Sequence, residues 1–123
     1  MVKLSEYGLL PMKCILGYVP TAQYDAPEVF NRKRELKSDV WSLGVTLMEL
    51  AEKENPLKGV SKLDAEDWFC NNDPPSLSSE KWSAEFVDFI RKCLVMGVKE
   101  RWSVKQLMEV SLYYVCLMSS IPL

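Results

Sequence analysis

Apolar residues recur at helical spacing in four stretches of the chain, separated by segments rich in Pro, Gly and Asn. The first stretch is SDVWSLGVTLMELAE at 38–52. Ser38 is expected to be its N-cap, with Asp39 in the first turn, where a carboxylate suits the helix dipole. Asn55-Pro56 is expected to end the helix. Because so few positions are polar, the pattern predicts a helix buried on most of its circumference. The polar positions are Ser42, Thr46, Glu49 and Lys53.

Three further helices are expected after the first. Ser61 and Asp64 form an approximate capping box for a short helix, which the NNDPP run at 71–75 terminates. Ser83 caps the next helix, whose apolar stripe ends near Gly97. That stripe consists of Phe86, Phe89, Ile90, Cys93 and Leu94.

The last helix begins with a second capping box, formed by Ser103 and Gln106. Before the first helix, VKL at 2–4 is a candidate short strand and the residues up to Asp25 a loop, because Pro11, Gly17 and Pro20 interrupt regular structure. The fold class predicted by the whole pattern is mainly α.

Composition limits the classes of function. A chain of 123 residues with 48% hydrophobic content has room for a single core. Its net charge of −2 offers no basic surface to neutralise phosphates, so nucleic acid is not an expected partner. Histidine is absent and the cysteines form no C-x-x-C pair, so neither a metal site nor a disulfide framework is expected. The apolar tail at 112–123 is too short to span a bilayer, so the chain is expected to be cytoplasmic, with no membrane contact.

Four motifs occur in an order that adds specificity to this pattern. SDVWSLGVTLMELAE resembles the central F helix in the C-terminal lobe of eukaryotic protein kinases, and VKLSEYG resembles the strand and D-F-G motif that open the activation segment. APE at 26–28 resembles the motif that closes this segment, and the residues from Lys81 to Glu109 resemble the last helices of the family. The sequence around Trp82 resembles that of the Ser/Thr kinases of MAP kinase cascades, of the sterile-family type.

The resemblance implies a partial kinase fold with C-lobe helices only and no N-terminal β lobe. It divides the chain into a degenerate activation segment at 1–28, a helical subdomain at 38–109 and an unmatched apolar tail at 110–123.

Several site residues are implied by the same resemblance. Glu6, Tyr7 and Gly8 occupy the D-F-G position, where Glu6 replaces the aspartate that binds magnesium. Thr21 lies in the substrate-docking loop, after a proline at position 20 where glycine is usual. Phosphorylation candidates in this segment are Tyr18, Thr21 and Tyr24.

The resemblance also implies a structural ion pair between Glu28 of APE and Arg101 after the H helix, and it makes Asp39 and Trp41 the F-helix anchor. Kinase catalysis further requires a glycine-rich loop, a lysine, the H-R-D aspartate and an asparagine, and none of these has a counterpart here. The chain is therefore expected to be catalytically inactive and to need no cofactor, with ATP and Mg expected only for a full-length parent.

Two functions from different classes remain open. The chain is either part of a Ser/Thr kinase whose parent transfers the γ-phosphoryl group of ATP, or a complete pseudokinase-like remnant that binds proteins. A helical domain that matches kinases by accident is a third alternative. Protein partners are expected, including a second copy. A face of the central helix with some of Val40, Leu43, Leu47 and Leu50 would lack cover, and the tail at 112–123 and a partner copy would both cover it.

Overall fold

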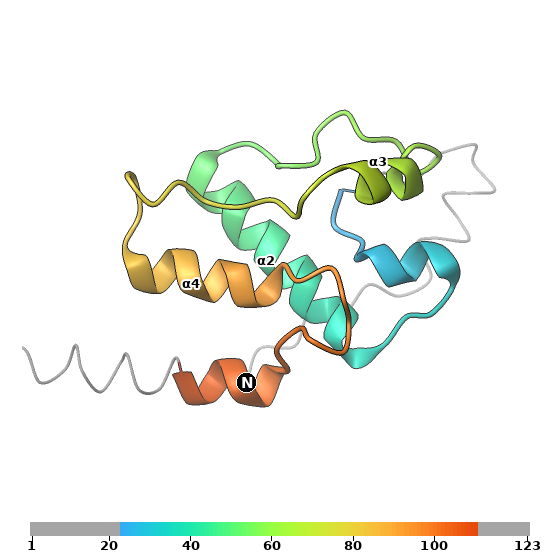
Figure 1. Ribbon diagram of the computed structural model, residues 1–123. Helices are drawn as coiled ribbons and strands as arrows, with labels where there is room; N and C mark the ends of the chain where they lie inside the picture. The colour runs from blue at the N-terminus through green and yellow to red at the C-terminus, as the bar shows by residue number, and fades with distance from the viewer. Residues whose placement is uncertain (1–22, 111–123) are drawn as a thin grey trace, which may run out of the picture.

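The computed structural model describes residues 23–110. It contains the 3-10 helix η1 (Pro27–Asn31) and the helices α2 (Leu36–Glu52), α3 (Ala65–Asn71) and α4 (Ala84–Cys93) (Figure 1). A further helix begins at 104 and continues to 110, the end of the described range. No strand occurs between 23 and 110, so the predicted mainly α fold is confirmed. The strand expected at 2–4 and the tail at 111–123 lie outside the described residues.

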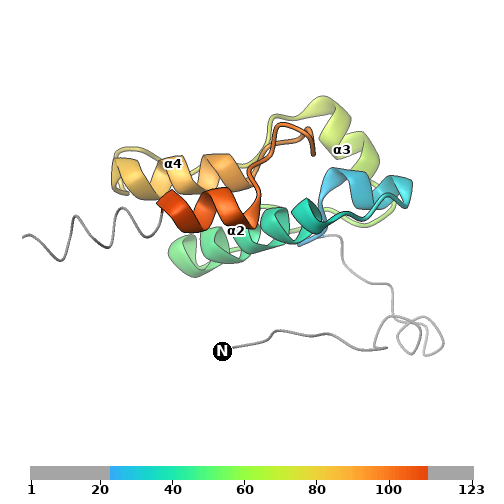
Figure 2. The ribbon, with the colours of Figure 1, turned by 90° about the horizontal axis from the view of Figure 1, so that it is seen from below.

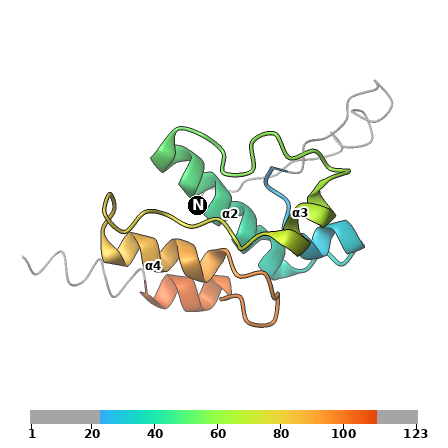
Figure 3. The ribbon, with the colours of Figure 1, turned by 45° about the horizontal axis from the view of Figure 1, so that its top comes forward.

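Helix α2 is the centre of the structure. Helix α4 packs across it, and the helix at 104–110 lies beside both, as two views at right angles show (Figures 1 and 2). At the N-terminal end of α2, α3 contacts η1 (Figure 3). This arrangement brings the segment that ends at η1 close to the loop that follows α4.

The core forms where α2 and α4 cross. Gly44 of α2 permits a close approach, because a Cβ atom there would lie 2.7 Å from Cβ of Cys93. Any larger residue at position 44 would therefore push the helices apart. The buried apolar residues of this core include Val40, Trp41, Val45, Met48, Ile90, Cys93, Leu94 and Leu107.

The start of α2 differs from the prediction. The helix begins at Leu36 with Glu35 as the N-cap, and Ser38 is the third residue of the first turn. The Glu35 side chain accepts from the Ser38 backbone N–H, while the Ser38 hydroxyl accepts from the Glu35 N–H at 3.0 Å. Ser38 as N-cap was thus wrong, because the serine completes a reciprocal capping box from inside the helix. Asp39 does lie in the first turn, as expected.

Other helix boundaries are also set by contacts outside the helix. Helix α2 ends at Glu52, before Asn55-Pro56, and Lys53 closes it in the left-handed conformation with φ 61°. Helix α3 begins at Ala65 rather than near Ser61, whose hydroxyl instead bonds the Asp64 carboxylate in the preceding turn.

The caps of the last two helices are as predicted. The Ser83 hydroxyl accepts from the Phe86 N–H, and Ser103 and Gln106 exchange both bonds of a capping box. Helix α4 ends at Cys93, however, before the expected stop at Gly97.

Burial of α2 is one-sided. The face with Val40, Trp41, Val45 and Met48 is buried, but Leu43 and Leu50 are 43% and 72% exposed. The prediction of burial on most sides therefore does not hold for the opposite face within the part of the chain that the structure describes. Between 23 and 110, no helix is both long enough and apolar enough to cross a membrane.

Candidate functional site

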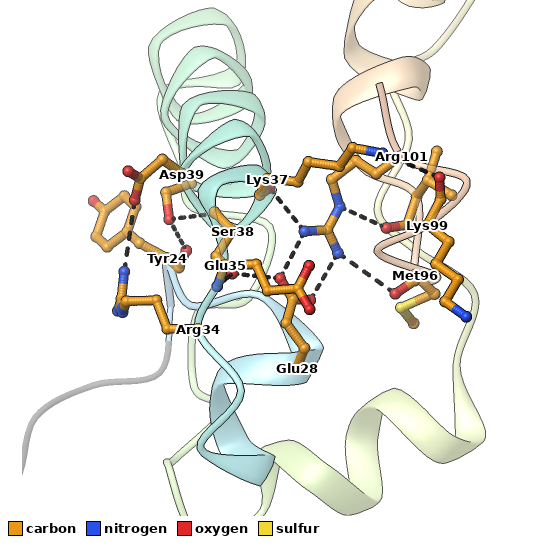
Figure 4. A network of polar contacts seen from close by, with 12 residues as sticks. Tyr24, Glu28, Arg34, Glu35, Lys37, Ser38, Asp39, Met96, Lys99 and Arg101 are labelled. Atoms are coloured by element: carbon orange, nitrogen blue, oxygen red, sulfur yellow. Dashed lines mark hydrogen bonds and ion pairs between the residues drawn. The ribbon is translucent and has the colours of Figure 1, made fainter. Parts of the chain in front are cut away.

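An ion pair between Glu28 and Arg101 joins η1 to the loop after α4. The Arg101 guanidinium meets the Glu28 carboxylate with two parallel hydrogen bonds, Nη1 to Oε2 at 2.8 Å and Nη2 to Oε1 at 2.9 Å (Figure 4). The two residues are 73 positions apart in the sequence, and their side chains are 0% and 10% exposed for arginine and glutamate. The structure thus brings together the pair that the kinase resemblance implies.

Arg101 has a partner for each of its guanidinium N–H groups. Besides Glu28, it donates to the backbone carbonyls of Lys37 at 2.8 Å, Val95 at 2.9 Å and Met96 at 3.4 Å. A guanidinium has five N–H donors, so these bonds satisfy all of them. Its central carbon also lies 5.3 Å from the centre of the Trp41 ring, within range of a cation–π contact. One side chain therefore ties η1, α2 and the 94–102 loop together.

The Glu28 carboxylate has a third donor, the Ser38 hydroxyl, at 2.6 Å from Oε2. Burial is the largest influence on its pKa and raises it, but the hydrogen bonds from Arg101 and Ser38 act together and hold the pKa of Glu28 below its ordinary value. The glutamate is therefore charged at neutral pH, as a buried ion pair requires.

Local sequence explains how each partner is held. Pro27 opens η1 with a backbone already restricted to helical φ, and the preceding Ala26 is fully buried. At the other end of the ion pair, the Arg101 backbone N–H donates to the Gly97 carbonyl at 3.0 Å and closes a turn. Because α4 ends at Cys93, the Val95 and Met96 carbonyls lie in the following loop and accept from Arg101.

The two residues of the expected F-helix anchor lie in different environments. Trp41 is fully buried, packs edge-on against Phe69 and has an indole N–H without a hydrogen-bond partner in the described structure. Asp39 is exposed, and its carboxylate lies 3.6 Å from the Arg34 guanidinium. Among the described residues, Asp39 therefore serves the first turn of α2 rather than a buried contact.

Tyr24 is the one phosphorylation candidate within the described range. Its hydroxyl donates to the Glu49 carboxylate of α2, and the Ser42 hydroxyl donates to its backbone carbonyl at 2.7 Å. The bond to Glu49, with burial as a second cause, raises the pKa of Tyr24 above 10.0. Glu6, Tyr7, Gly8, Tyr18 and Thr21 lie outside the described residues.

Sequence reasoning missed the other partners of the ion pair. Ser38 was assigned to the helix cap alone, and the carbonyls of Lys37, Val95 and Met96 carry no sequence signal. A serine near the start of the central helix was visible, but only the tertiary structure turns its hydroxyl toward Glu28.

Clusters of metal-ligating side chains and surface hollows are the features of residues 23–110 that could mark a further site. Between 23 and 110, no three His, Cys, Asp or Glu side chains are grouped so that they could hold a metal ion. Two surface hollows of about 580 Å³ each are present, one near Met48 and Gly59 and one near Leu36 and Val98. Neither is lined by Glu28, Arg101, Asp39 or Trp41.

Comparison with known proteins agrees with this geometry. Residues 2–113 match the protein kinase domain. The chain is 42% identical over 114 residues to the serine/threonine-protein kinase pakH of Dictyostelium discoideum, an alignment that covers 88% of the chain and 22% of that relative. It is 34% identical to the serine/threonine-protein kinase Tao of Drosophila melanogaster and 36% identical to Misshapen-like kinase 1 of Rattus norvegicus. Each of these two alignments covers 88% of the chain, but only 11% of Tao and 9% of Misshapen-like kinase 1.

The chain therefore spans about a fifth or less of the length of these relatives. Its match to the kinase domain nevertheless covers most of its own residues, including all those described here. The helical fold, the APE segment and its arginine partner all lie within that match. The chain belongs to the protein kinase family.

Proposed function

We propose that this chain forms the activation-segment and C-lobe part of a Ser/Thr protein kinase whose parent transfers the γ-phosphoryl group of ATP to protein hydroxyl groups. The observation that carries the proposal is the Glu28–Arg101 ion pair, which fixes the end of the APE segment to the helical core. The printed names of the relatives, serine/threonine-protein kinases, support the substrate class. Under this proposal, residues 1–28, 38–109 and 110–123 are activation segment, helical subdomain and apolar tail, in a cytoplasmic protein.

The chemistry requires more groups than this chain contains. In kinases a substrate hydroxyl oxygen attacks the γ-phosphorus, ADP leaves, and the H-R-D aspartate accepts the hydroxyl proton. The 123 residues contain no histidine and thus no H-R-D, and Glu6 is their counterpart of the D-F-G aspartate. We propose that the isolated chain neither transfers phosphate nor binds ATP, and that ATP and magnesium are held by the parent.

A chimera tests this function. The part of Tao kinase that precedes the strand before its D-F-G motif is fused to Val2 of this chain, with Glu6→Asp to restore the magnesium ligand. We expect this chimera to phosphorylate a general protein substrate with radiolabelled ATP. The isolated chain, and the chimera with its H-R-D aspartate changed to asparagine, should both be inactive. A folded chimera without activity, or an active isolated chain, would contradict the proposal.

A second candidate function is a pseudokinase-like module that binds proteins without catalysis. The observation in its favour is the glutamate at the D-F-G position, since magnesium tolerates misplaced ligands poorly. Comparing the chimera with and without Glu6→Asp separates the two functions. Activity only after the substitution favours the pseudokinase, whereas equal activity shows that glutamate can hold the metal.

A further inference from the structure

We propose that the hollow between the first turn of α2 and the 97–103 loop binds an acidic segment of a partner protein through one large apolar side chain. The hollow has a volume of about 580 Å³. Leu36 and Val98 supply its apolar wall, and the rest of the lining consists of Glu35, Lys37, Lys99 and Ser103. Leu36 is 90% exposed although it begins a helix, so its side chain is available to a ligand.

The two chain segments that form this hollow are rich in basic residues. Segments 31–37 and 97–105 together hold seven of the 15 Lys and Arg residues of the chain but only two of its 17 Asp and Glu. The Lys37 ammonium donates to the Lys99 carbonyl at 3.0 Å, which keeps it at the rim, and the Lys99 side chain is exposed. The basic residues of the two segments are Arg32, Lys33, Arg34, Lys37, Lys99, Arg101 and Lys105.

The acidic groups nearby do not cancel this charge. The Glu35 side chain accepts from the Ser38 backbone N–H in the cap of α2. A carboxylate oxygen of Glu100 lies only 2.2 Å from the place where a Cβ of Gly97 would be, so it folds over its own loop. Asp39 is beside Arg34, and Arg101 is occupied by Glu28. Lys37 and Lys99 therefore outnumber Glu35, the one carboxylate in the lining of the hollow.

The charge distribution also selects the kind of partner. Outside the two segments, the chain carries 15 Asp and Glu against eight Lys and Arg. A broad anionic surface, such as a membrane or a nucleic acid, would meet this acidic remainder and be repelled. A short acidic peptide can contact Lys37 and Lys99 without extending over this remainder. The apolar wall then favours a Leu or Phe within the acidic sequence, because burial of one such side chain stabilises by about 1.5–3 kcal/mol.

The position of the hollow gives such binding a structural consequence. Lys37 lines the hollow with its side chain, while its carbonyl accepts from Arg101. Lys37 thus connects the hollow to the network that holds Glu28 and the end of the APE segment (Figure 4). A peptide bound here rests on a rigid surface next to that segment. The inference concerns binding alone and does not depend on catalysis by this chain.

Binding is tested with the full 123-residue chain and a fluorescent twelve-residue peptide of Glu and Asp with one central Leu. We expect saturable anisotropy at low salt that weakens as salt is added, and about tenfold or greater loss when the peptide Leu becomes Ser. Charge reversal by Lys37→Glu with Lys99→Glu, or loss of the wall by Leu36→Ser, should each weaken binding about tenfold or more.

The matched control is Lys58→Glu with Lys62→Glu, since both lysines are exposed and lie outside the two basic segments. Circular dichroism checks that every variant is folded. The proposal is overturned if the control weakens binding as much as the Lys37 and Lys99 pair does, or if the peptide binds equally well without its Leu. It is also overturned if phosphatidylserine vesicles bind in a Lys37-dependent manner and the peptide does not.

Discussion

At the scale of single residues, Arg101 is the side chain on which most of the described structure depends. Arg101→Ala leaves the Glu28 carboxylate partly buried and removes the donors to three backbone carbonyls. Loss of one partner of a buried ion pair costs about 3–5 kcal/mol. We therefore expect the free energy of unfolding, measured by urea titration with circular dichroism, to fall by at least about 3 kcal/mol.

Arg91→Ala is the matched control, because the Arg91 guanidinium is 76% exposed and pairs with Asp88 at the surface. Its effect should be within about 1 kcal/mol. Arg101→Lys should fall nearer to Arg101→Ala than to the wild type, since an ammonium has three donors and lacks the planar fork. An unchanged melting temperature for Arg101→Ala would mean that the pair is absent in solution.

Glu28 gives the same network a defined pH dependence. Because its folded-state pKa lies below the ordinary 4.5, the ionised form stabilises the fold above that value, and this contribution is lost as pH falls through the folded pKa. Thermal melts of wild type and Glu28→Gln should therefore differ most near neutral pH and converge in acid. A difference that stays constant as pH falls would show that folding does not shift the pKa of Glu28, and one that grows would show that its pKa is raised.

The two free cysteines in the described range should react differently with a thiol reagent. Cys70 is exposed, whereas Cys93 is buried at the helix crossing and burial raises the pKa of its thiol to about 12. Brief treatment of the folded chain with iodoacetamide should label Cys70 and leave Cys93 unmodified until urea is added. Peptide mass spectrometry measures both sites, and early labelling of Cys93 would indicate that α4 opens readily.

At the level of single residues, the sequence predicted the ion pair but not the other hydrogen bonds that its two side chains make. Glu28 and Arg101 were named because the motifs of a family carry them. Ser38 was assigned to the wrong position of the right helix, since a serine near a helix start fits both the cap and the third position. Only the approach of η1, ten residues earlier in sequence, shows why its hydroxyl is buried.

At the scale of elements, the crossing of α2 and α4 depends on Gly44. A methyl group at this position would lie 2.7 Å from Cβ of Cys93 and 2.9 Å from a Leu94 methyl, and the first contact cannot be relieved by rotating a side chain. Gly44→Ala should therefore destabilise by about 1–3 kcal/mol through overpacking, although alanine is the better helix former. Urea denaturation measures the difference.

Thr46→Ala is the control for helix propensity. Thr46 is exposed on the same helix, and its hydroxyl donates to the Ser42 carbonyl one turn earlier. This substitution should be neutral or slightly stabilising. If Gly44→Ala stabilised the chain to the same extent, the two helices would have to be farther apart than the structure places them.

Helix existence was predictable, whereas helix ends were not. The apolar stripe of α4 and its Ser83 cap identified that helix from sequence alone. Its end at Cys93 is followed by a loop whose Val95 and Met96 carbonyls accept from Arg101, a contact that no local pattern encodes. Helix α2 likewise ends before Asn55, whose side-chain oxygen accepts from the Leu57 N–H at 2.8 Å and forms the following turn.

At the scale of the whole molecule, the apolar periodicity correctly predicted that α2 is the central helix. It could not predict which parts of the molecule pack against each face of that helix. Leu43 and Leu50 are exposed, and Leu47 between them is half-buried. We call these three residues the leucine face. A contiguous apolar face of this kind is uncommon on a monomer. We propose that the 123-residue chain covers it in solution by pairing with a second copy.

The spacing of the leucine face suits a two-fold axis. If two α2 helices pack antiparallel about a point between Thr46 and Leu47, Leu43 of one copy meets the partner's Leu50, and the reverse contact is identical. Such a dimer needs about 1,000 Å² or more of buried surface to be stable. Residues next to the leucine face would contribute part of this area.

Light scattering after size exclusion should therefore give twice the mass of 14.1 kDa, with dissociation on dilution. Leu50→Glu should yield a monomer, because symmetry brings a carboxylate from each copy into an apolar contact. Leu63→Glu is the control, since Leu63 is 90% exposed but lies outside α2, and it should leave the dimer intact. If the unmodified chain remains a monomer as its concentration rises, or if Leu63→Glu disrupts pairing as Leu50→Glu does, the leucine face is not the dimer contact.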